Sequence, residues 1–484
     1  MAETAVPRIV STVSAGESVD LSRVHFVGVG GVGMLPVARV CAERGFVVSC
    51  SDTATSEALA VLSGVGVGVH RGQAAGQVPA DATAVVFTHA VAETNPEIVE
   101  ARRMGIPLVH RSVALNSLLV GRTAVGVLGT HGKSSTAGML AFALTGMGLN
   151  PSYVVGGDLD GPASGGRYGG AGGFFVAEVD ESDRTHVGVG VDVAVITNIS
   201  YDHVENYAGE LDHVDAYEAC VRGVRPGGTV VLNVDSGGCR ELASRLVMAG
   251  DGPRLVTFGQ SSSADWRLTR AVSVGGRSTG VLCGPGGLEF DLAVGVAGVH
   301  QLVNAAGAVA AALHVLNQDC DAVVEQLCGF RGVYRRMSSA GVAGGVHVYD
   351  SFAHHPEEVC ADLAAAHSLF DAEARVFTVF QAPGQVRLDA FGAEFAKALA
   401  GCAHVVVTGG GSRSRREGAL RELAESVVHA GGSASVSLAG GEAVLEVAVR
   451  ARPGDVVVLM GTGDLVGQGP LLRAMLAEPT LRES

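Results

Sequence analysis

The sequence predicts an α/β protein of three units in which strands and helices alternate. A length of 484 residues is too great for one ordinary core and suggests about three domains. Hydrophobic residues make up 47% of the chain and charged residues 17%, which is typical of a folded globular protein. A strand, a glycine turn and a helix follow one another near the start and again after residue 121, and a third alternating unit begins near residue 346. We therefore expect domains over residues 1–120, 121–333 and 334–484.

The pattern of the first unit predicts a doubly wound parallel sheet. Residues 24–27 form an apolar segment typical of a buried strand, and a helical pattern covers residues 34–44. Further strands are expected at residues 46–50 and 84–87. Because strands and helices alternate here, the strands should lie parallel.

The second and third units continue this alternation. In the second unit, strands are expected at 124–128, 174–177, 193–197 and 229–233, followed by short β segments within 254–296. Helices are expected at 134–147 and, rich in alanine, at 302–316. The third is predicted to hold strands that begin near 346 and continue at 376–380, 404–407 and 456–460. Glycine-rich stretches at residues 165–173 and 409–411 are interpreted as loops.

Composition excludes several classes of function. A net charge of −15 opposes binding to nucleic acid, and no run of 18 apolar residues suggests a membrane span. The N-terminus lacks a basic-then-apolar export signal. The nine cysteines are scattered and never form a C-x-x-C pair, which is typical of free thiols in a reducing cytosol. We expect a cytoplasmic protein that acts on small molecules, without nucleic-acid or membrane partners.

A first glycine motif lies between the strand at 24–27 and the following helix. Its glycines are Gly28, Gly30, Gly31 and Gly33, and Asp52 ends the next predicted strand. Glycines at such a turn let a pyrophosphate approach the N-terminus of the helix, where free N–H groups favour anions. The pattern fits a dinucleotide, a UDP-sugar or a plain tight turn, and on its own would also allow an NAD-dependent dehydrogenase.

A second glycine motif predicts a phosphate loop for ATP. It reads Gly129-Thr130-His131-Gly132-Lys133-Ser134-Ser135-Thr136, between a predicted strand and a predicted helix. Backbone N–H groups would surround the phosphates, Lys133 would reach the β- and γ-oxygens, and Ser134 would bind Mg²⁺. The motif departs from the strict pattern at Val127, which stands six residues before Lys133 in place of glycine.

Lysine usage supports a special role for Lys133. Of the 34 basic residues only two are lysines, Lys133 and Lys397. A lysine retained in a chain that otherwise uses arginine suggests a site where a compact ammonium fits and a planar guanidinium does not. For Lys397, in a helical stretch, we favour chance.

Acidic residues follow the predicted strand at 174–177. Residues 178–183 read Glu-Val-Asp-Glu-Ser-Asp, and carboxylates at the end of a strand in a phosphate-binding domain are placed to hold Mg²⁺. His203 follows the next strand at the same edge of the sheet and is a candidate second metal ligand.

Together these motifs resemble those of the Mur ligase family, and the matches extend along nearly the whole chain. They comprise residues 28–34, 125–136, Gly156-Gly157-Asp158, 178–183, Thr197-Asn198-Ile199, Asp202-His203, His300, Asn304-Ala305, Phe330, Gly332, Arg335-Arg336, 349–356 and 461–464. Ordered motifs spread over three domains are more specific than any one of them.

The resemblance implies a fold, a reaction and a set of site residues. The expected fold is α/β with three domains: a Rossmann-like N-terminal domain for a UDP-sugar, a central P-loop ATPase domain with a mostly parallel sheet, and a Rossmann-like C-terminal domain that closes over the site. The implied UDP-sugar residues are Gly28, Gly30, Gly31, Gly33 and Asp52. The implied ATP residues are Gly129, Thr130, His131, Gly132, Lys133, Ser134, Ser135, Asn304, Arg336 and Asp350. Metal ligands would be Ser134, Glu178 and His203, and the catalytic residues Lys133, His203, Arg387 and His355.

The implied reaction is amide-bond formation that consumes ATP in the presence of Mg²⁺. ATP would phosphorylate the lactyl carboxylate of UDP-N-acetylmuramate, and the amine of an amino acid, expected to be L-alanine, would attack the acyl phosphate. This is a step of peptidoglycan precursor synthesis. Lys133, arginines and Mg²⁺ would offset the charge of the anionic groups, and domain closure would exclude water.

Departures from the family pattern cluster around the third domain. Gln301 stands at a usual asparagine, Ser351 at a frequent aspartate and Phe352 at a frequent tyrosine. Pro383 and Gln385 replace a histidine and a tyrosine, and residues 408–416 lack an acidic, proline-containing tract. A divergent paralogue with another amino acid or acyl acceptor, or a non-catalytic nucleotide-binding descendant, therefore remains an alternative.

Overall fold

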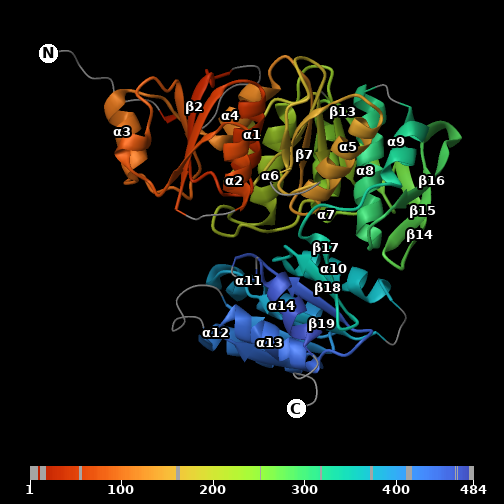
Figure 1. Cartoon of the computed structure of the whole chain (residues 1–484). Coiled ribbons are helices and arrows are strands. Elements are labelled where there is room, and N and C mark those ends of the chain that lie inside the picture. The colour runs from red at the N-terminus through yellow and green to blue at the C-terminus, as the bar shows by residue number, and fades with distance from the viewer. Residues whose placement is uncertain are drawn as a thin grey trace.

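Three sheets, each covered by helices, form the protein (Figure 1). The computed structural model describes residues 9–10, 18–53, 57–159, 164–250, 252–316, 319–370, 374–409, 417–463, 465 and 467–478. Within these residues no helix combines the length and the apolar character needed to cross a membrane. The first and central sheets lie side by side, and the third lies beneath the central one in the view of Figure 1.

The first sheet has six parallel strands in the order β1-β6-β5-β2-β3-β4. Its strands are β1 (Ile9–Val10), β2 (Arg23–Val27), β3 (Val47–Asp52), β4 (Gly68–Arg71), β5 (Ala84–Phe87) and β6 (Leu108–His110). Its helices are α1 (Leu35–Glu43), α2 (Glu57–Gly64), the 3₁₀ helix η1 (Ala75–Gln77), α3 (Pro96–Met104) and α4 (Arg111–Leu119). Strand order reverses at β2, so a crevice for a ligand is expected beyond the ends of β2 and β5.

The central sheet has ten strands in the order β16-β15-β14-β13-β12-β11-β7-β10-β8-β9. The strands are β7 (Thr123–Leu128), β8 (Ser152–Val154), β9 (Gly166–Arg167), β10 (Phe174–Glu178), β11 (Val193–Ile196), β12 (Thr229–Asn233), β13 (Arg254–Gly259), β14 (Trp266–Val274), β15 (Arg277–Cys283) and β16 (Glu289–Val294). The helices are α5 (Lys133–Gly146), η2 (Thr185–Gly188), α6 (Glu210–Arg222), α7 (Gly237–Ala249), η3 (Pro285–Gly287), α8 (Val299–Leu316) and α9 (Cys320–Leu327). The strands around β7 are parallel, and β14, β15 and β16 form an antiparallel extension.

The third sheet has six strands in the order β17-β18-β22-β19-β20-β21. The strands are β17 (Arg336–Ala343), β18 (Val346–Ser351), β19 (Val376–Gln381), β20 (His404–Thr408), β21 (Ala434–Ser437) and β22 (Val456–Met460), and β17 alone among them pairs antiparallel. The helices are α10 (Pro356–Ser368), α11 (Gln385–Leu399), α12 (Glu417–His429), α13 (Gly440–Arg450) and α14 (Gln468–Ala477). Asp464 and residues 410–416, which the sequence motifs include, lie outside the described residues.

The α/β fold class with a mostly parallel central sheet is confirmed, and the predicted strands lie within about two residues of observed ones. The predicted boundaries fall between sheets: residue 120 follows α4 and residue 333 precedes β17. The division into domains at these residues stays a prediction. The interpretation of residues 165–173 as a loop was wrong at Gly166–Arg167, because these residues form β9 against β8.

The first and central sheets share one hydrophobic cluster. It includes Val24 and Phe26 of β2, Ala124 of β7 and Phe175 of β10, all at most 2% exposed. A Cβ atom at Gly166 would lie less than 3 Å from the Cα atom of Pro36 in α1, so only glycine allows this close approach. The two sheets are therefore packed as one continuous body.

Candidate active site

One cleft of about 1300 Å³ is lined by residues of all three sheets. Gly28 comes from the first, Lys133 from the central and Arg387 from the third. Each follows a strand end: Gly28 after β2, Lys133 after β7 and Arg387 in the first turn of α11, after β19. Ligands of parallel α/β sheets bind at the carboxyl ends of the strands, so the position of the cleft is the one expected for a ligand site in all three units.

The predicted phosphate loop connects β7 to α5. Gly129 has a φ of 130° and Gly132 a φ of 80°, which are conformations that favour glycine. The N-cap of α5 is Gly132, and no side chain caps the helix there. The free N–H groups of this helix end therefore face the cleft, as an anion site requires.

Lys133 is enclosed by its own loop and by a buried acid. Its Nζ donates to Gly129 O at 2.7 Å and to Thr130 O at 3.1 Å, and lies 2.8 Å from Glu181 Oε2. Burial disfavours the ammonium ion, but Glu181, Asp180 and Glu178 outweigh this effect and raise the pKa of Lys133. Burial raises the pKa of Glu181 to about 7, although Lys133 acts against that rise.

Ser134 and Glu178 lie together at the start of α5 and the end of β10. Ser134 Oγ donates to Glu178 Oε1 at 3.1 Å, and Gly156 N donates to Glu178 Oε2 at 2.6 Å. Arg336 of the third domain donates to Ser134 Oγ at 3.0 Å. Hard oxygen atoms of this kind suit Mg²⁺.

His203 lies beside a bidentate ion pair between Arg387 and Asp202. Arg387 Nε and Nη2 donate to Asp202 Oδ1 and Oδ2 at 2.9 and 3.0 Å, and Nη2 lies 3.2 Å from His203 Nδ1. Burial opposes ionisation of Asp202, but His203 and Arg387 outweigh it and hold the pKa of this carboxyl well below its usual range. Burial lowers the pKa of His203. His203 Nε2 is 3.7 Å from Glu181 Oε1, so this histidine neighbours the acid that holds Lys133.

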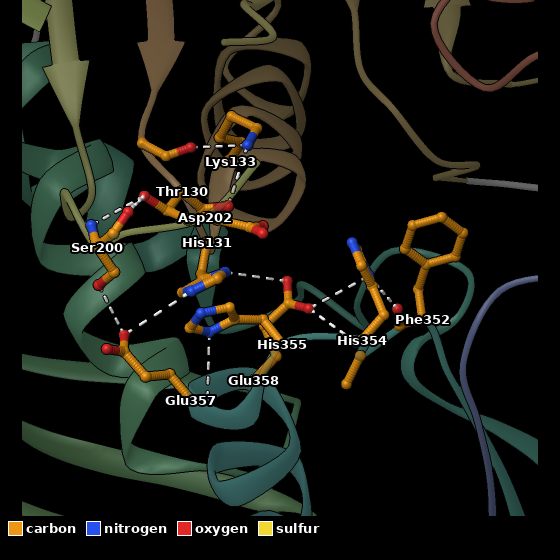
Figure 2. Close-up of polar contacts among 12 residues, drawn as sticks. Thr130, His131, Lys133, Ser200, Asp202, Phe352, His354, His355, Glu357 and Glu358 are labelled. Atoms are coloured by element: carbon orange, nitrogen blue, oxygen red, sulfur yellow. Dashed lines mark hydrogen bonds and ion pairs between the residues drawn. The ribbon is translucent and has the colours of Figure 1, made fainter. Parts of the chain in front are cut away.

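A chain of polar contacts joins the phosphate loop to the N-terminus of α10 (Figure 2). Thr130 Oγ1 donates to Ser200 O at 3.0 Å, and Ser200 Oγ donates to Glu357 Oε2 at 2.8 Å. His131 Nδ1 lies 3.3 Å from Glu358 Oε1. Burial acts against the charged form of His131, but Glu358 outweighs this and raises its pKa. The third domain therefore contacts the loop that would hold the phosphates.

His355 packs behind this contact. Its ring lies 4.5 Å from that of His131, and its Nδ1 accepts a hydrogen bond from Glu357 N at the start of α10. Burial lowers the pKa of His355 to about 4, so the ring is neutral near neutral pH.

The first glycine motif has the geometry of an anion loop. Gly28 has a φ of 73°, and Gly30 N donates to Asp52 Oδ2 at 2.7 Å. Next to it Arg111 Nη2 donates to Asp180 Oδ2 at 2.9 Å, which links the first domain to the acidic cluster of the central one. A Cβ atom at Gly33 would lie 2.5 Å from the Arg111 guanidinium, so any larger residue at this position would displace the Arg111 side chain.

Most of the predicted site residues line the cleft. Those that do are Gly28, Gly31, Gly33, Asp52, Thr130, His131, Gly132, Lys133, Ser134, Ser135, Glu178, His203, Asn304, Arg336 and Arg387. Four predicted residues do not line the cleft: Gly30, Gly129, His355 and Asp350. The N–H of Gly30 donates to Asp52, and the carbonyl of Gly129 accepts from Lys133. His355 packs on His131, and Asp350 belongs to β18. Ser134 and Glu178 are in contact, whereas the His203 side chain, within the described part of the chain, lies beside Glu181, Asp202, Glu205 and Arg387.

The positions that depart from the family pattern make contacts of their own. Gln301 Nε2 lies 3.0 Å from His300 Nε2. Ser351 Oγ donates to Asp362 Oδ2 at 2.5 Å. The Phe352 ring lies 5.0 and 4.7 Å from the guanidinium carbons of Arg335 and Arg336.

Sequence reasoning missed three groups of the site, Arg111, Glu357 and Glu358. Arg111 directly follows β6, and the argument from strand ends that singled out Glu178 would have found it. The two glutamates lie in the first turn of α10 and contact His131 across the domain boundary. No local signal predicts that contact.

The fold and the cleft define an ATP-type phosphate site between three α/β domains, and the sequence comparisons identify the class. Residues 23–123 match the Mur ligase family, catalytic domain, residues 127–312 the Mur ligase middle domain, and residues 335–463 the Mur ligase, glutamate ligase domain. The chain belongs to the Mur ligase family.

Similar proteins carry the name of one particular ligase. UDP-N-acetylmuramate–L-alanine ligase of Streptomyces coelicolor is 40% identical over 463 residues, which cover 95% of this chain and 98% of that protein. The protein of the same name from Kineococcus radiotolerans is 40% identical over 483 residues, covering 96% and 100%. The crystal structure of UDP-N-acetylmuramate-alanine ligase from Thermotoga maritima has a TM-score of 0.76 at 28% identity, covering 93% of this chain and 98% of that one.

Proposed function

We propose that this protein is an ATP-dependent ligase that joins L-alanine to the lactyl carboxylate of UDP-N-acetylmuramate through an acyl phosphate, in peptidoglycan precursor synthesis. The observation that carries the proposal is the position of Lys133, in a phosphate loop within one cleft to which three domains contribute. Relatives about 40% identical over nearly the whole chain carry the name of this ligase.

The phosphate loop provides binding and charge for ATP. The free N–H groups at the start of α5 would hold phosphate oxygens, and Lys133 would leave Gly129 O and Thr130 O to contact the β- and γ-phosphates. Glu181 keeps the ammonium charged and directed into the loop. Arg336 adds a second cation beside Ser134.

The donor set beside this loop fits Mg²⁺. Ser134 Oγ and the Glu178 carboxylate are adjacent hard oxygen ligands at the phosphate loop and would hold the ion, with His203 as a further candidate ligand. When bound, Mg²⁺ neutralises phosphate charge during phosphoryl transfer.

The residues around His203 would act on the acyl phosphate. A carboxylate is a poor electrophile until its oxygen becomes a leaving group, and the phosphorylated acid then meets the amine. Arg387, fixed by Asp202, places a guanidinium where it can neutralise the acyl phosphate. His355 is neutral and buried behind His131, which suits a role in positioning His131.

Contacts between domains would protect the intermediate. Glu357 and Glu358 of α10 contact the phosphate-loop side of the cleft through Ser200 and His131. Closure of the third domain over the central one excludes water, which would otherwise hydrolyse the acyl phosphate.

A divergent paralogue with another amino acid is the second candidate. Gln385 is exposed in the first turn of α11, two residues before Arg387, where the family pattern has a tyrosine. Phe352 lacks the hydroxyl of the frequent tyrosine. Gln385 neighbours Arg387, on the side of the cleft assigned to the amino acid. Phe352 instead lies against Arg336 beside the phosphate loop, whose own residues follow the family.

A phosphate-release assay with ATP, Mg²⁺, UDP-N-acetylmuramate and a panel of amino acids tests the proposal. Release that requires both the UDP-sugar and L-alanine is expected. Release with a different amino acid or acceptor establishes the paralogue. ATP binding without release for any pair indicates a non-catalytic descendant, and turnover of a nicotinamide cofactor would revive the dehydrogenase alternative.

We also propose a cytoplasmic location. All nine cysteines are free thiols, and six of them are buried, in agreement with a reducing compartment. The precursors on which such a ligase acts are small molecules, so no nucleic-acid or membrane partner is expected.

A further inference from the structure

Two histidines and an aspartate meet at the junction of the first and central domains. His89 follows β5, His110 is the last residue of β6, and Asp183 lies between β10 and η2. Asp183 Oδ2 is 3.3 Å from His89 Nδ1 and 3.0 Å from His110 Nε2. One ligand atom from each residue lies within 4.8 Å of the other two.

His110 directs a nitrogen without a hydrogen-bond partner into this group. The side chain is 1% exposed, and among the described residues its Nε2 has no partner with hydrogen-bond geometry, although Asp183 Oδ2 is close. Its Nδ1 lies 2.9 Å from Ser112 Oγ. Ser112 N donates to the same Nδ1 at 3.3 Å, so Nε2 carries the ring proton and faces Asp183 when no ion is bound. Binding of a metal ion at Nε2 would move this proton to Nδ1, which would then donate to Ser112 Oγ, as is common for histidines that bind metals.

The carboxylate of Asp183 is oriented from its other side. Its Oδ1 accepts hydrogen bonds from Thr185 N at 3.2 Å and Thr185 Oγ1 at 2.5 Å. Oδ2 is left to face both imidazoles. Two of the three potential ligands, His110 and Asp183, are thus oriented by partners outside the group.

The spacing suits a tetrahedral metal ion. Ligand atoms at about 2.0–2.1 Å from a tetrahedral Zn²⁺ lie roughly 3.3 Å apart. The two distances to Asp183 are 3.3 and 3.0 Å, and His89, 61% exposed, can turn to bring its nitrogen closer to that of His110.

We propose that His89, His110 and Asp183 bind a divalent d-block metal ion such as Zn²⁺ or Co²⁺. Two imidazoles with one carboxylate favour such an ion over Mg²⁺, which prefers oxygen ligands. His89 and Asp183 line the cleft, so the fourth coordination position faces it and can take a water molecule or a phosphate oxygen. The site is distinct from the oxygen ligands Ser134 and Glu178. A bound ion would tie the first domain to the central one beside the first glycine motif.

Metal binding to the full-length protein tests this site without an activity assay. Stripped protein is dialysed against Co²⁺ or Zn²⁺ in excess Mg²⁺, and the bound equivalents are counted for wild type and for His89→Ala. The exposed His89 side chain makes this variant safe for folding. Ions bound at other sites are present in both proteins, so the difference in bound equivalents between wild type and His89→Ala counts only the ion at this site. We expect wild type to bind one equivalent more than His89→Ala.

Two further variants sharpen the result. Asp183→Asn should lose the same equivalent, and His429→Ala, an exposed histidine at the end of α12, should keep it. Wild-type Co²⁺ protein should also show a tetrahedral Co²⁺ absorption spectrum that His89→Ala lacks. Equal metal content in wild type and His89→Ala, or no binding in excess Mg²⁺, overturns the proposal.

Discussion

Lys133 Nζ lies 2.8 Å from Glu181 Oε2, and the Glu181 side chain has no exposure to solvent. The same ammonium donates to two carbonyls of its own loop. Three acceptors thus surround one compact cation at the start of α5. This geometry agrees with the retention of lysine in a chain that otherwise uses arginine.

Lys133→Arg should nearly abolish turnover, because a planar guanidinium cannot occupy the space between Gly129 O, Thr130 O and Glu181. We expect a fall in kcat of at least about 100-fold, in line with the loss of a positioned transition-state cation. Phosphate release measures it. Lys397→Arg, at the exposed position on α11, is the matched control and should behave as wild type. A Lys133→Arg enzyme close to wild type would refute this account of the lysine.

Glu178→Gln should weaken the use of Mg²⁺ while leaving the fold intact. The amide keeps a neutral oxygen near Ser134 but removes the negative charge that favours a divalent cation. The Mg²⁺ concentration for half-maximal activity should rise about ten-fold or more. Glu241→Gln, on the surface of α7, is the control and should leave the titration unchanged. Identical Mg²⁺ titrations for wild type and Glu178→Gln would exclude Glu178 as a ligand.

Asp202→Asn should reduce kcat because it breaks the bidentate ion pair that fixes the Arg387 guanidinium. The pair joins the central domain to α11 and is largely buried, so the loss of one partner's charge is costly. We expect a fall in kcat of about ten-fold or more, with little change in the KM for ATP. Lys397→Ala, at an exposed position on the same helix, controls for general disturbance of α11. Should both variants lose activity equally, the ion pair has no special role.

Phe352→Ala should weaken ATP binding through Arg336. The ring lies against the guanidinium groups of Arg335 and Arg336, and each such contact contributes about 0.5–2 kcal/mol. We expect the Kd for ATP to rise about 3- to 30-fold. Phe352→Tyr keeps the aromatic face and should bind ATP as wild type does. Equal weakening in both variants would assign the effect to packing in general.

The buried imidazole of His186 should make the protein sensitive to acid. Burial, with a contribution from His213, lowers the pKa of His186 from 6.5 to about 4. The stability due to the neutral ring is fully present above pH 6.5 and is lost as the pH falls toward about 4. This group alone corresponds to about 3 kcal/mol of unfolding free energy across that range.

Urea unfolding at several pH values measures this dependence. His186→Phe removes the proton-binding site and should flatten the fall in unfolding free energy below pH 6.5. His429→Phe, on the surface, should keep the wild-type slope. The interpretation fails if wild type and His186→Phe lose stability in parallel.

Contiguous motifs made much of the fold and the phosphate loop predictable. β7, Gly129, Gly132 and α5 follow one another in the chain, so spacing alone predicts a phosphate loop there. Short elements were missed. β6 spans only Leu108–His110, and so brief an apolar run has no clear periodicity.

Contacts between domains could not be predicted in this way. His131 and Glu358 meet only because the third domain lies against the central one, and nothing local in either segment encodes that arrangement. The same limit applies to metal ligands. The family resemblance grouped Ser134, Glu178 and His203 as ligands, whereas the position of His203 beside Arg387 depends on α11 of another domain.

The hydrophobic cluster shared by β2 and β7 limits how this chain can be recombined. A first domain excised near residue 120 would carry an exposed apolar face, and so would the remainder, so a chimaera joined there should aggregate unless both faces come from one parent. Among the described residues, Ala297 is the one residue of the central domain that belongs to the core clusters of the third domain. Exchange of the segment after residue 333 should therefore disturb the remaining cores less than exchange of the segment before residue 120.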